Sequence, residues 1–155
     1  MLKQRKRTGI HAASLLYALS VTCAQSQMPQ QVNRNILEAV QRVQLAHDAN
    51  HQVAAAEHLR TVTLETNSQL VGDREIHAIA SLVDDRNDAV TYWVAEALGH
   101  FGQRARFIAP TLTEILDRRE CMIAETSSVD MIRNTLKQIG SPAPPQNCSH
   151  YTLPR

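Results

Sequence analysis

Three histidines in the N-terminal half of the sequence have the spacing of metal ligands. His47, His51 and His58 would lie within roughly 40° of a common line on one continuous α-helix, because each residue turns a helix by about 100°. Imidazoles four residues apart on a helix are typical ligands of zinc and copper. However, no Cys or acid completes an obvious set, and residues 48–50 could end the helix. We therefore expect three solvated histidines and keep a metal site as the alternative.

The sequence shows no arrangement typical of nucleophilic catalysis. It contains no Gly-x-Ser-x-Gly turn and no Cys next to a plausible His partner, while His77, His100 and His150 are scattered. By the usual checklist for active sites, we expect neither enzymatic activity nor a cofactor.

The N-terminus has the three consecutive parts of a cleavable signal peptide. A basic region is followed by an apolar run and then by small residues at a cleavage site. These parts are Lys3, Arg5, Lys6 and Arg7, then residues 12–21, then residues 22–24. The apolar run falls well short of the roughly twenty residues that span a bilayer. We predict that residues 1–24 are removed on export to the periplasm, with cleavage after Ser26 as the alternative, and that no membrane span remains.

Cys23 offers a second alternative, a lipid anchor. A bacterial lipoprotein box resembles Leu, two small residues and then Cys. Here Leu19 stands one place too far back and Thr22 directly precedes the Cys. We therefore favour a cleaved leader over a lipid-anchored protein.

The charge of the exported chain argues against nucleic acid as a partner. Residues 25–155 contain 12 basic and 15 acidic residues, a formal charge of −3. Proteins that bind nucleic acid neutralise phosphates and usually present a basic face. About 130 residues suit one domain with its own core.

The two cysteines outside the leader are predicted to form a disulfide. Cys121 and Cys148 are 27 residues apart, and two cysteines in an oxidising compartment normally pair. The chain-entropy model gives such a bond roughly 3 to 3.5 kcal/mol. It would tie back the proline-rich tail of residues 141–155, which is a poor helix former. Two free thiols are the alternative.

Helical periodicity is the only strong structural pattern between residues 25 and 140. Apolar residues recur at intervals of three and four, and no stretch alternates with the period of a strand. Gly102 and Gly140 are suited to ending helices, because glycine readily adopts the left-handed conformation. We expect an all-α domain of about six helices without a sheet. The segments are 32–45 and 53–62, which form a hairpin or alternatively one long helix, and 76–83, 90–101, 105–116 and 128–139.

The helical segments carry a family resemblance. Residues 88–102, DAVTYWVAEALGHFG, resemble the second helix of a HEAT repeat of the lyase-associated type, and residues 108–117 resemble the first helix of the next repeat. Thr91 replaces the usual Arg of the family, and Trp93 stands where Ala is common. The resemblance implies a short right-handed solenoid of antiparallel helix pairs, with repeats at about 73–102 and 105–140.

This resemblance also suggests a binding surface. Tyr92, Glu96 and His100 follow one another at intervals of four and form one exposed ridge of the second helix. In stacked helix pairs the second helices line the concave face that binds partners, and Tyr is enriched at interfaces. Trp93 and Phe107, together with Phe101, are expected to face the core. An ordinary solvated face is the alternative.

Two loops offer a rival surface. One is the polar turn that contains Asp85 and Arg86, and the other is the segment from Arg118 through Arg119 to Glu120, braced by the predicted disulfide. A rigid protrusion is suited to occluding an enzyme cleft, because preorganisation lowers the entropic cost of binding. The alternative is that Asp88 caps a helix and the other charges keep the turn soluble.

The combination of export, small size, helical repeats and a disulfide resembles periplasmic immunity proteins. Such proteins inhibit cell-wall amidase toxins that type VI secretion delivers. The resemblance implies a protein-binding module with one partner, a toxin hydrolase whose active site it occludes. A general periplasmic scaffold is the alternative, a metal-binding protein is a less favoured one, and a homodimer is left open.

Overall fold

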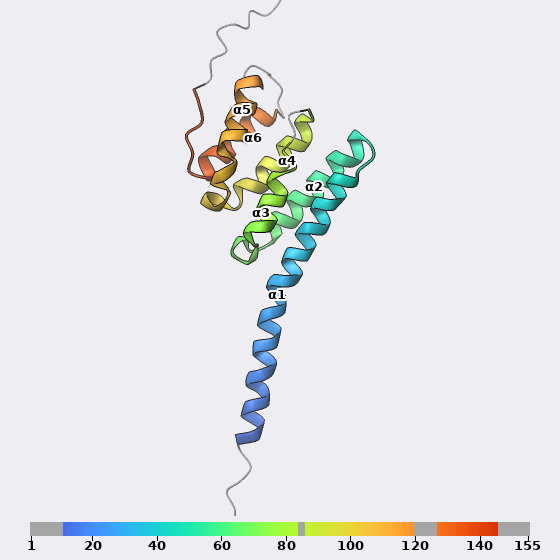
Figure 1. Cartoon of the computed structure of the whole chain (residues 1–155), viewed down its shortest axis with the longest axis vertical. Coiled ribbons are helices and arrows are strands. Elements are labelled where there is room, and N and C mark those ends of the chain that lie inside the picture. The colour runs from blue at the N-terminus through green and yellow to red at the C-terminus, as the bar shows by residue number, and fades with distance from the viewer. Residues whose placement is uncertain (1–10, 84–85, 120–126, 146–155) are drawn as a thin grey trace, which may run out of the picture.

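The computed structural model describes residues 11–83, 86–119 and 127–145. This part of the chain is all-α, as predicted, and contains no strand (Figure 1). Two short 3₁₀ helices accompany six α-helices. The elements are α1 (His11–Leu45), α2 (Ala49–Glu65), η1 (Ser68–Leu70), α3 (Asp73–Ala80), α4 (Asp88–Gly99), η2 (Gly102–Ile108), α5 (Ala109–Arg119) and α6 (Ser128–Gln138).

The helices pack as successive neighbouring pairs. α1 packs against α2, α4 lies between α2 and α6, α3 contacts both α1 and α4, and α5 contacts α6. The N-terminal part of α1 extends away from the other helices (Figure 1). Stacking of pairs is what a solenoid requires, while the right-handed HEAT-like winding stays a prediction.

A capped turn separates the first two helices. Asp48 accepts a hydrogen bond from the backbone N–H of His51 at 3.0 Å and occupies the N-cap of α2. Such a bond satisfies one of the four N–H groups that a helix start leaves unpaired. The segment therefore forms the predicted hairpin, and one continuous helix is excluded.

Glycines end or separate helices where the sequence predicted. Gly140 has a φ of 73°, and the N–H of Ser141 donates to the carbonyl of Leu136 at 2.8 Å. This is the pairing of a Schellman motif, which satisfies carbonyls at a helix end. Gly102, with a φ of 55°, marks the change from α4 to η2.

Every α-helix contributes to one apolar core. Completely buried Leu and Ile side chains come from each of them, and burying one such side chain contributes roughly 1.5–3 kcal/mol. One example from each helix, in chain order, is Ile36, Leu59, Ile76, Leu98, Leu116 and Ile132.

The structure corrects several local predictions. The helix expected at 105–116 is divided, because η2 ends at Ile108 and α5 then begins just before Pro110. Proline is tolerated there, since the first turn of a helix has unpaired N–H groups in any case. Asn87, rather than Asp88, caps α4 and accepts from the N–H of Val90 at 3.2 Å.

Phe107 was expected in the core but is 42 % exposed, whereas Phe101 is buried as expected. The ring of Phe107 stacks on His77, with 3.9 Å between the ring centroids and 4° between the planes. η2 therefore turns Phe107 toward α3 rather than into the core.

Among the described residues, no helix has both the length and the apolar character needed to cross a membrane. Cys121 and Cys148 lie outside the described residues, so their disulfide stays a prediction. The signal peptide and the alternative lipid anchor at Cys23 also stay predictions.

Candidate protein-binding site

The predicted ridge on α4 is half-buried rather than fully exposed. Tyr92, Glu96 and His100 lie on the side of α4 that is not buried in the core. However, His100 donates from Nε2 to the carbonyl of Thr66 at 3.0 Å, and Glu96 accepts from Arg60 of α2. The ridge differs from the expectation because α2 packs beside α4 and occupies two of its three polar side chains.

Four side chains gather where α2 meets this side of α4, and we call them the Arg60–Trp93 cluster. Arg60 donates from Nη2 to Oε1 of Glu96 at 2.7 Å. Its guanidinium carbon lies 5.7 Å from the ring centroid of Trp93. Tyr92 meets Trp93 edge to face, with 4.8 Å between the centroids and 89° between the planes. The cluster consists of Arg60, Tyr92, Trp93 and Glu96.

The cluster holds a permanent positive charge in partial contact with solvent. The side chains of Arg60 and Glu96 are 33 % and 23 % exposed. The hydrogen bond with Glu96 is the main cause that raises the pKa of Arg60, burial opposes it, and the charges of Glu96 and Tyr92 add smaller contributions. Arg60 therefore stays protonated under all physiological conditions.

Several donors of the cluster have no hydrogen bond within the described residues. They are Nη1 of Arg60, the hydroxyl of Tyr92 and the indole N–H of Trp93. Nε of Arg60 is enclosed by protein and also lacks a partner. A half-buried face with unused donors next to aromatic rings is suited to binding an acceptor on another molecule.

Sequence reasoning identified half of this cluster. Tyr92 and Glu96 were predicted from their spacing on one helix, whereas Trp93 was placed in the core and Arg60 was not singled out. Trp93 is in fact only partly buried against the core. No local pattern identifies Arg60, because its partner Glu96 lies 36 residues away in the sequence.

Arg119 is buried, which contradicts its assignment to an exposed binding loop. Its side chain is 9 % exposed, and Nη1 donates to Oδ1 of Asp88 at 2.7 Å and to the hydroxyl of Ser128 at 2.9 Å. Asp88 also accepts from the N–H and the hydroxyl of Ser128. The helix α5 continues through Arg119, so this residue joins the adjoining ends of α4, α5 and α6.

The other loop residues give a mixed result. Arg118 is exposed and lies 3.8 Å from Glu114 of the same helix, and Arg86 is exposed but has a partner. Asp85 and Glu120 lie outside the described residues. A binding role for these loops stays a prediction.

The three histidines do not share one face, because the chain turns between the first two. His47 lies in the turn after α1, while His51 and His58 belong to α2. His51 bonds through Nδ1 to Asp48 at 2.5 Å, and Nε2 of His58 lies 3.4 Å from Arg42. Within the described ranges, no three metal-ligating side chains come together. The histidine stripe is therefore wrong.

Two of these histidines, His47 and His51, border an open groove of about 690 Å³ between α1 and α2. Glu38, Arg42 and Ala55 also line it, and so does Leu45, which is 63 % exposed. The groove lies on the side of α2 that faces α1, and the Arg60–Trp93 cluster lies on the side that faces α4.

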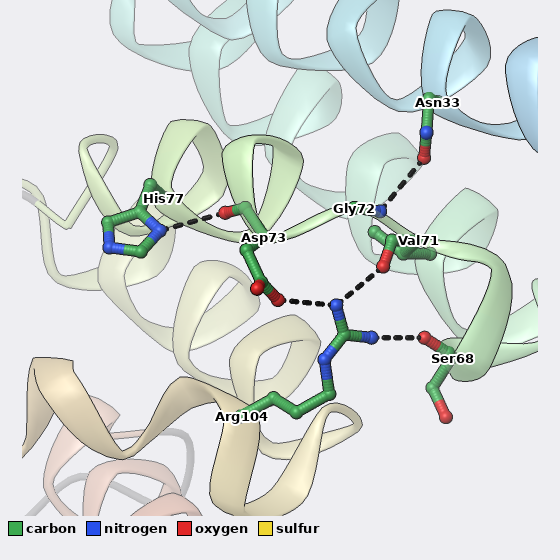
Figure 2. Close-up of polar contacts among 7 residues, drawn as sticks. All are labelled: Asn33, Ser68, Val71, Gly72, Asp73, His77 and Arg104. Atoms are coloured by element: carbon green, nitrogen blue, oxygen red, sulfur yellow. Dashed lines mark hydrogen bonds and ion pairs between the residues drawn. The ribbon is translucent and has the colours of Figure 1, made fainter.

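A second polar cluster holds the connection between α2 and α3 (Figure 2). Arg104 of η2 donates to the carbonyls of Ser68 and Val71 at 2.8 and 2.7 Å, and to Oδ1 of Asp73 at 2.5 Å. Asn33 of α1 accepts from the N–H of Gly72 at 3.0 Å. These bonds use Arg104 to fix backbone, so we assign this cluster a structural role.

Comparison of the chain with protein-family models, with curated proteins and with solved structures found no match in any of the three. Function therefore has to be argued from the sites themselves.

Proposed function

We propose that this chain is a periplasmic protein-binding module that occludes the active site of a cell-wall-degrading amidase toxin. The single observation that carries the binding role is the Arg60–Trp93 cluster. Arg, Trp and Tyr are the residue types that dominate binding energy at protein interfaces. Here one of each lies within a half-buried cluster that retains unused donors.

The cluster is also held in place before any partner arrives. Glu96 fixes the guanidinium of Arg60 at 2.7 Å, and the ring of Trp93 packs partly against the core. Binding then costs little side-chain entropy, because rotamers that are already restricted lose less freedom on association. Periplasmic location and toxin inhibition rest on the predicted leader and on the resemblance to immunity proteins.

A periplasmic scaffold is the second candidate, and the open groove between α1 and α2 favours it. A scaffold needs more than one binding surface, and this groove and the Arg60–Trp93 cluster lie on different sides of α2. An inhibitor predicts one tight partner, whereas a scaffold predicts several weaker ones.

The test is a pull-down from the periplasm of the native host. The protein carries a C-terminal affinity tag and its own leader, and retained proteins are identified by mass spectrometry. We expect one stoichiometric hydrolase that is lost with Tyr92→Ala and retained with Thr111→Ala, an exposed position on α5.

Purified hydrolase is then assayed on peptidoglycan with and without the protein. Loss of amidase activity at a one-to-one ratio supports inhibition. A hydrolase that stays active when bound, or several substoichiometric partners, would favour the scaffold. A retained complex with Tyr92→Ala would contradict the assigned site.

A further inference from the structure

The unused groups of the Arg60–Trp93 cluster are donors rather than acceptors. Nη1 of Arg60, the hydroxyl of Tyr92 and the indole N–H of Trp93 make no hydrogen bond within the described residues. The charged acceptor of the cluster, Glu96, is already bonded to Arg60. A partner group that forms hydrogen bonds with these donors must therefore supply hydrogen-bond acceptors.

The cluster pairs one positive and one negative charge, and the charged group in it that retains an unused donor is the guanidinium of Arg60. The guanidinium of Arg60 lies over the ring of Trp93, so an incoming Lys or Arg would meet a like charge at that face. Nη2 of Arg60 is bonded to Glu96 and Nε is enclosed by protein, so Nη1 is left to bond one oxygen of a carboxylate and the hydroxyl of Tyr92 to bond the other.

We propose that the cluster binds an acidic side chain, Asp or Glu, of the partner protein. Nη1 of Arg60 and the hydroxyl of Tyr92 donate to its carboxylate, and Trp93 covers the contact. This inference rests on the proposed function, since it names the partner group that the site takes.

Glu96 acts in this proposal as a positioning residue. It occupies Nη2 of Arg60 and so fixes the guanidinium, while Nη1 keeps no bond within the described residues. Because Glu96 is itself anionic, it lowers the affinity for a second carboxylate but increases the precision with which that carboxylate is placed.

The experiment uses the single Trp of the chain, which gives one indole N–H resonance in a ¹H–¹⁵N spectrum of the purified protein. N-acetyl-glutamate methylamide is the probe, and N-acetyl-glutamine methylamide is its neutral counterpart at the same ionic strength. N-acetylglycine, with a terminal carboxylate, distinguishes a side chain from a chain end.

We expect the blocked glutamate to shift the Trp93 indole resonance saturably, while the blocked glutamine leaves it in place. Arg60→Lys should weaken this binding about tenfold, since an ammonium bonded to Glu96 holds no second donor in a fixed direction. Tyr92→Phe should weaken it about fivefold by removing one hydrogen bond, and Thr111→Ala should leave it unchanged.

Equal shifts with both blocked amino acids, or no shift with either, would overturn the proposal. Binding of N-acetylglycine alone would overturn it as well, in favour of a chain terminus. The outcome is independent of the pull-down. If a partner is captured but the glutamate probe fails, only the acidic contact is wrong, whereas binding of the probe without any captured partner contradicts the proposed function.

Discussion

The two ends of α4 are held by ion pairs of equal length in different surroundings. Asp88, at the start of α4, accepts from Arg119 at 2.7 Å, and Glu96 accepts from Arg60 at the same distance. Arg119 is 9 % exposed and also bonds Ser128, whereas Arg60 is 33 % exposed and retains unused donors. Pairs of equal length therefore differ in their surroundings: the first joins α4, α5 and α6, and the second leaves donors unused within the described residues.

Side-chain size accounts for part of this difference. Where α4 meets α6, the small residues Ala95 and Gly99 are buried, and the hydroxyl of Thr135 donates to the carbonyl of Ala95 at 2.8 Å. Where α4 meets α2, the larger side chains of Trp93 and Arg60 stay partly exposed.

The largest expected effect comes from Asp88→Asn, which leaves the buried charge of Arg119 unpaired. Arg119 is 9 % and Asp88 38 % exposed, so the loss should be about 2 to 3 kcal/mol of unfolding free energy, no more than the lower end for a fully buried pair. Glu96→Gln is the matched change at the pair of the more exposed Arg60 and should cost less than about 1 kcal/mol. Urea unfolding followed by circular dichroism measures both, and equal losses would remove the distinction between the two pairs.

Gly99→Leu should cost about 2 kcal/mol, because extra side-chain volume is forced into the contact between α4 and α6. Gly99→Ala is its control. The Cβ of Ala would clash with the end of the exposed Gln138 side chain, which can move aside, and would make an ordinary contact with Oγ1 of Thr135 at 3.6 Å. Thermal unfolding should place the Ala variant close to the parent protein, and a large loss there would show that α6 cannot adjust.

Thr135→Val tests the buried hydrogen bond that the Thr135 hydroxyl donates to the carbonyl of Ala95, in the same contact between α4 and α6. Removing this hydroxyl should cost about 1 kcal/mol. Thr61→Val is the control, because its hydroxyl donates to the carbonyl of Glu57 within α2 at 3.1 Å and is more exposed. The control should change the free energy of unfolding in urea by less than about 0.5 kcal/mol. A larger loss of unfolding free energy in Thr61→Val than in Thr135→Val would be inconsistent with a tightly packed contact between α4 and α6.

The smallest effect is expected at the exposed N-terminus of α2. The hydrogen bond from the backbone of His51 is the main cause that lowers the pKa of Asp48. In the unfolded chain the carboxyl has its ordinary pKa of about 3.9. The stabilisation by the charged cap is therefore fully present above about pH 4 and is lost as the pH falls through the lower pKa of the folded state.

Asp48→Asn retains a capping side chain that does not titrate. Melting temperatures from about pH 3 to about pH 6 should therefore fall slightly less on acidification in this variant than in the parent protein. Identical pH profiles would show that the charge of Asp48 contributes no measurable stability.

Much of the fold could be predicted from residues that lie close together in the sequence. Apolar spacing predicted helices close to the observed α2, α4 and α6, and the glycines at 102 and 140 adopt the positive φ that their positions suggested. Asp48 at the break between α1 and α2 was recognisable for the same reason, since capping involves residues only three positions apart.

The surroundings of polar and aromatic side chains were decided by tertiary packing. The sequence placed Arg119 in a loop and Phe107 in the core, but Arg119 is buried by Asp88 and Ser128, and Phe107 is stacked on His77. Arg60 meets Glu96 only because α2 and α4 lie side by side. Helix formation depends on contacts within a few residues, whereas the burial of a charge depends on which distant helix covers it, and periodicity carries no information about that partner.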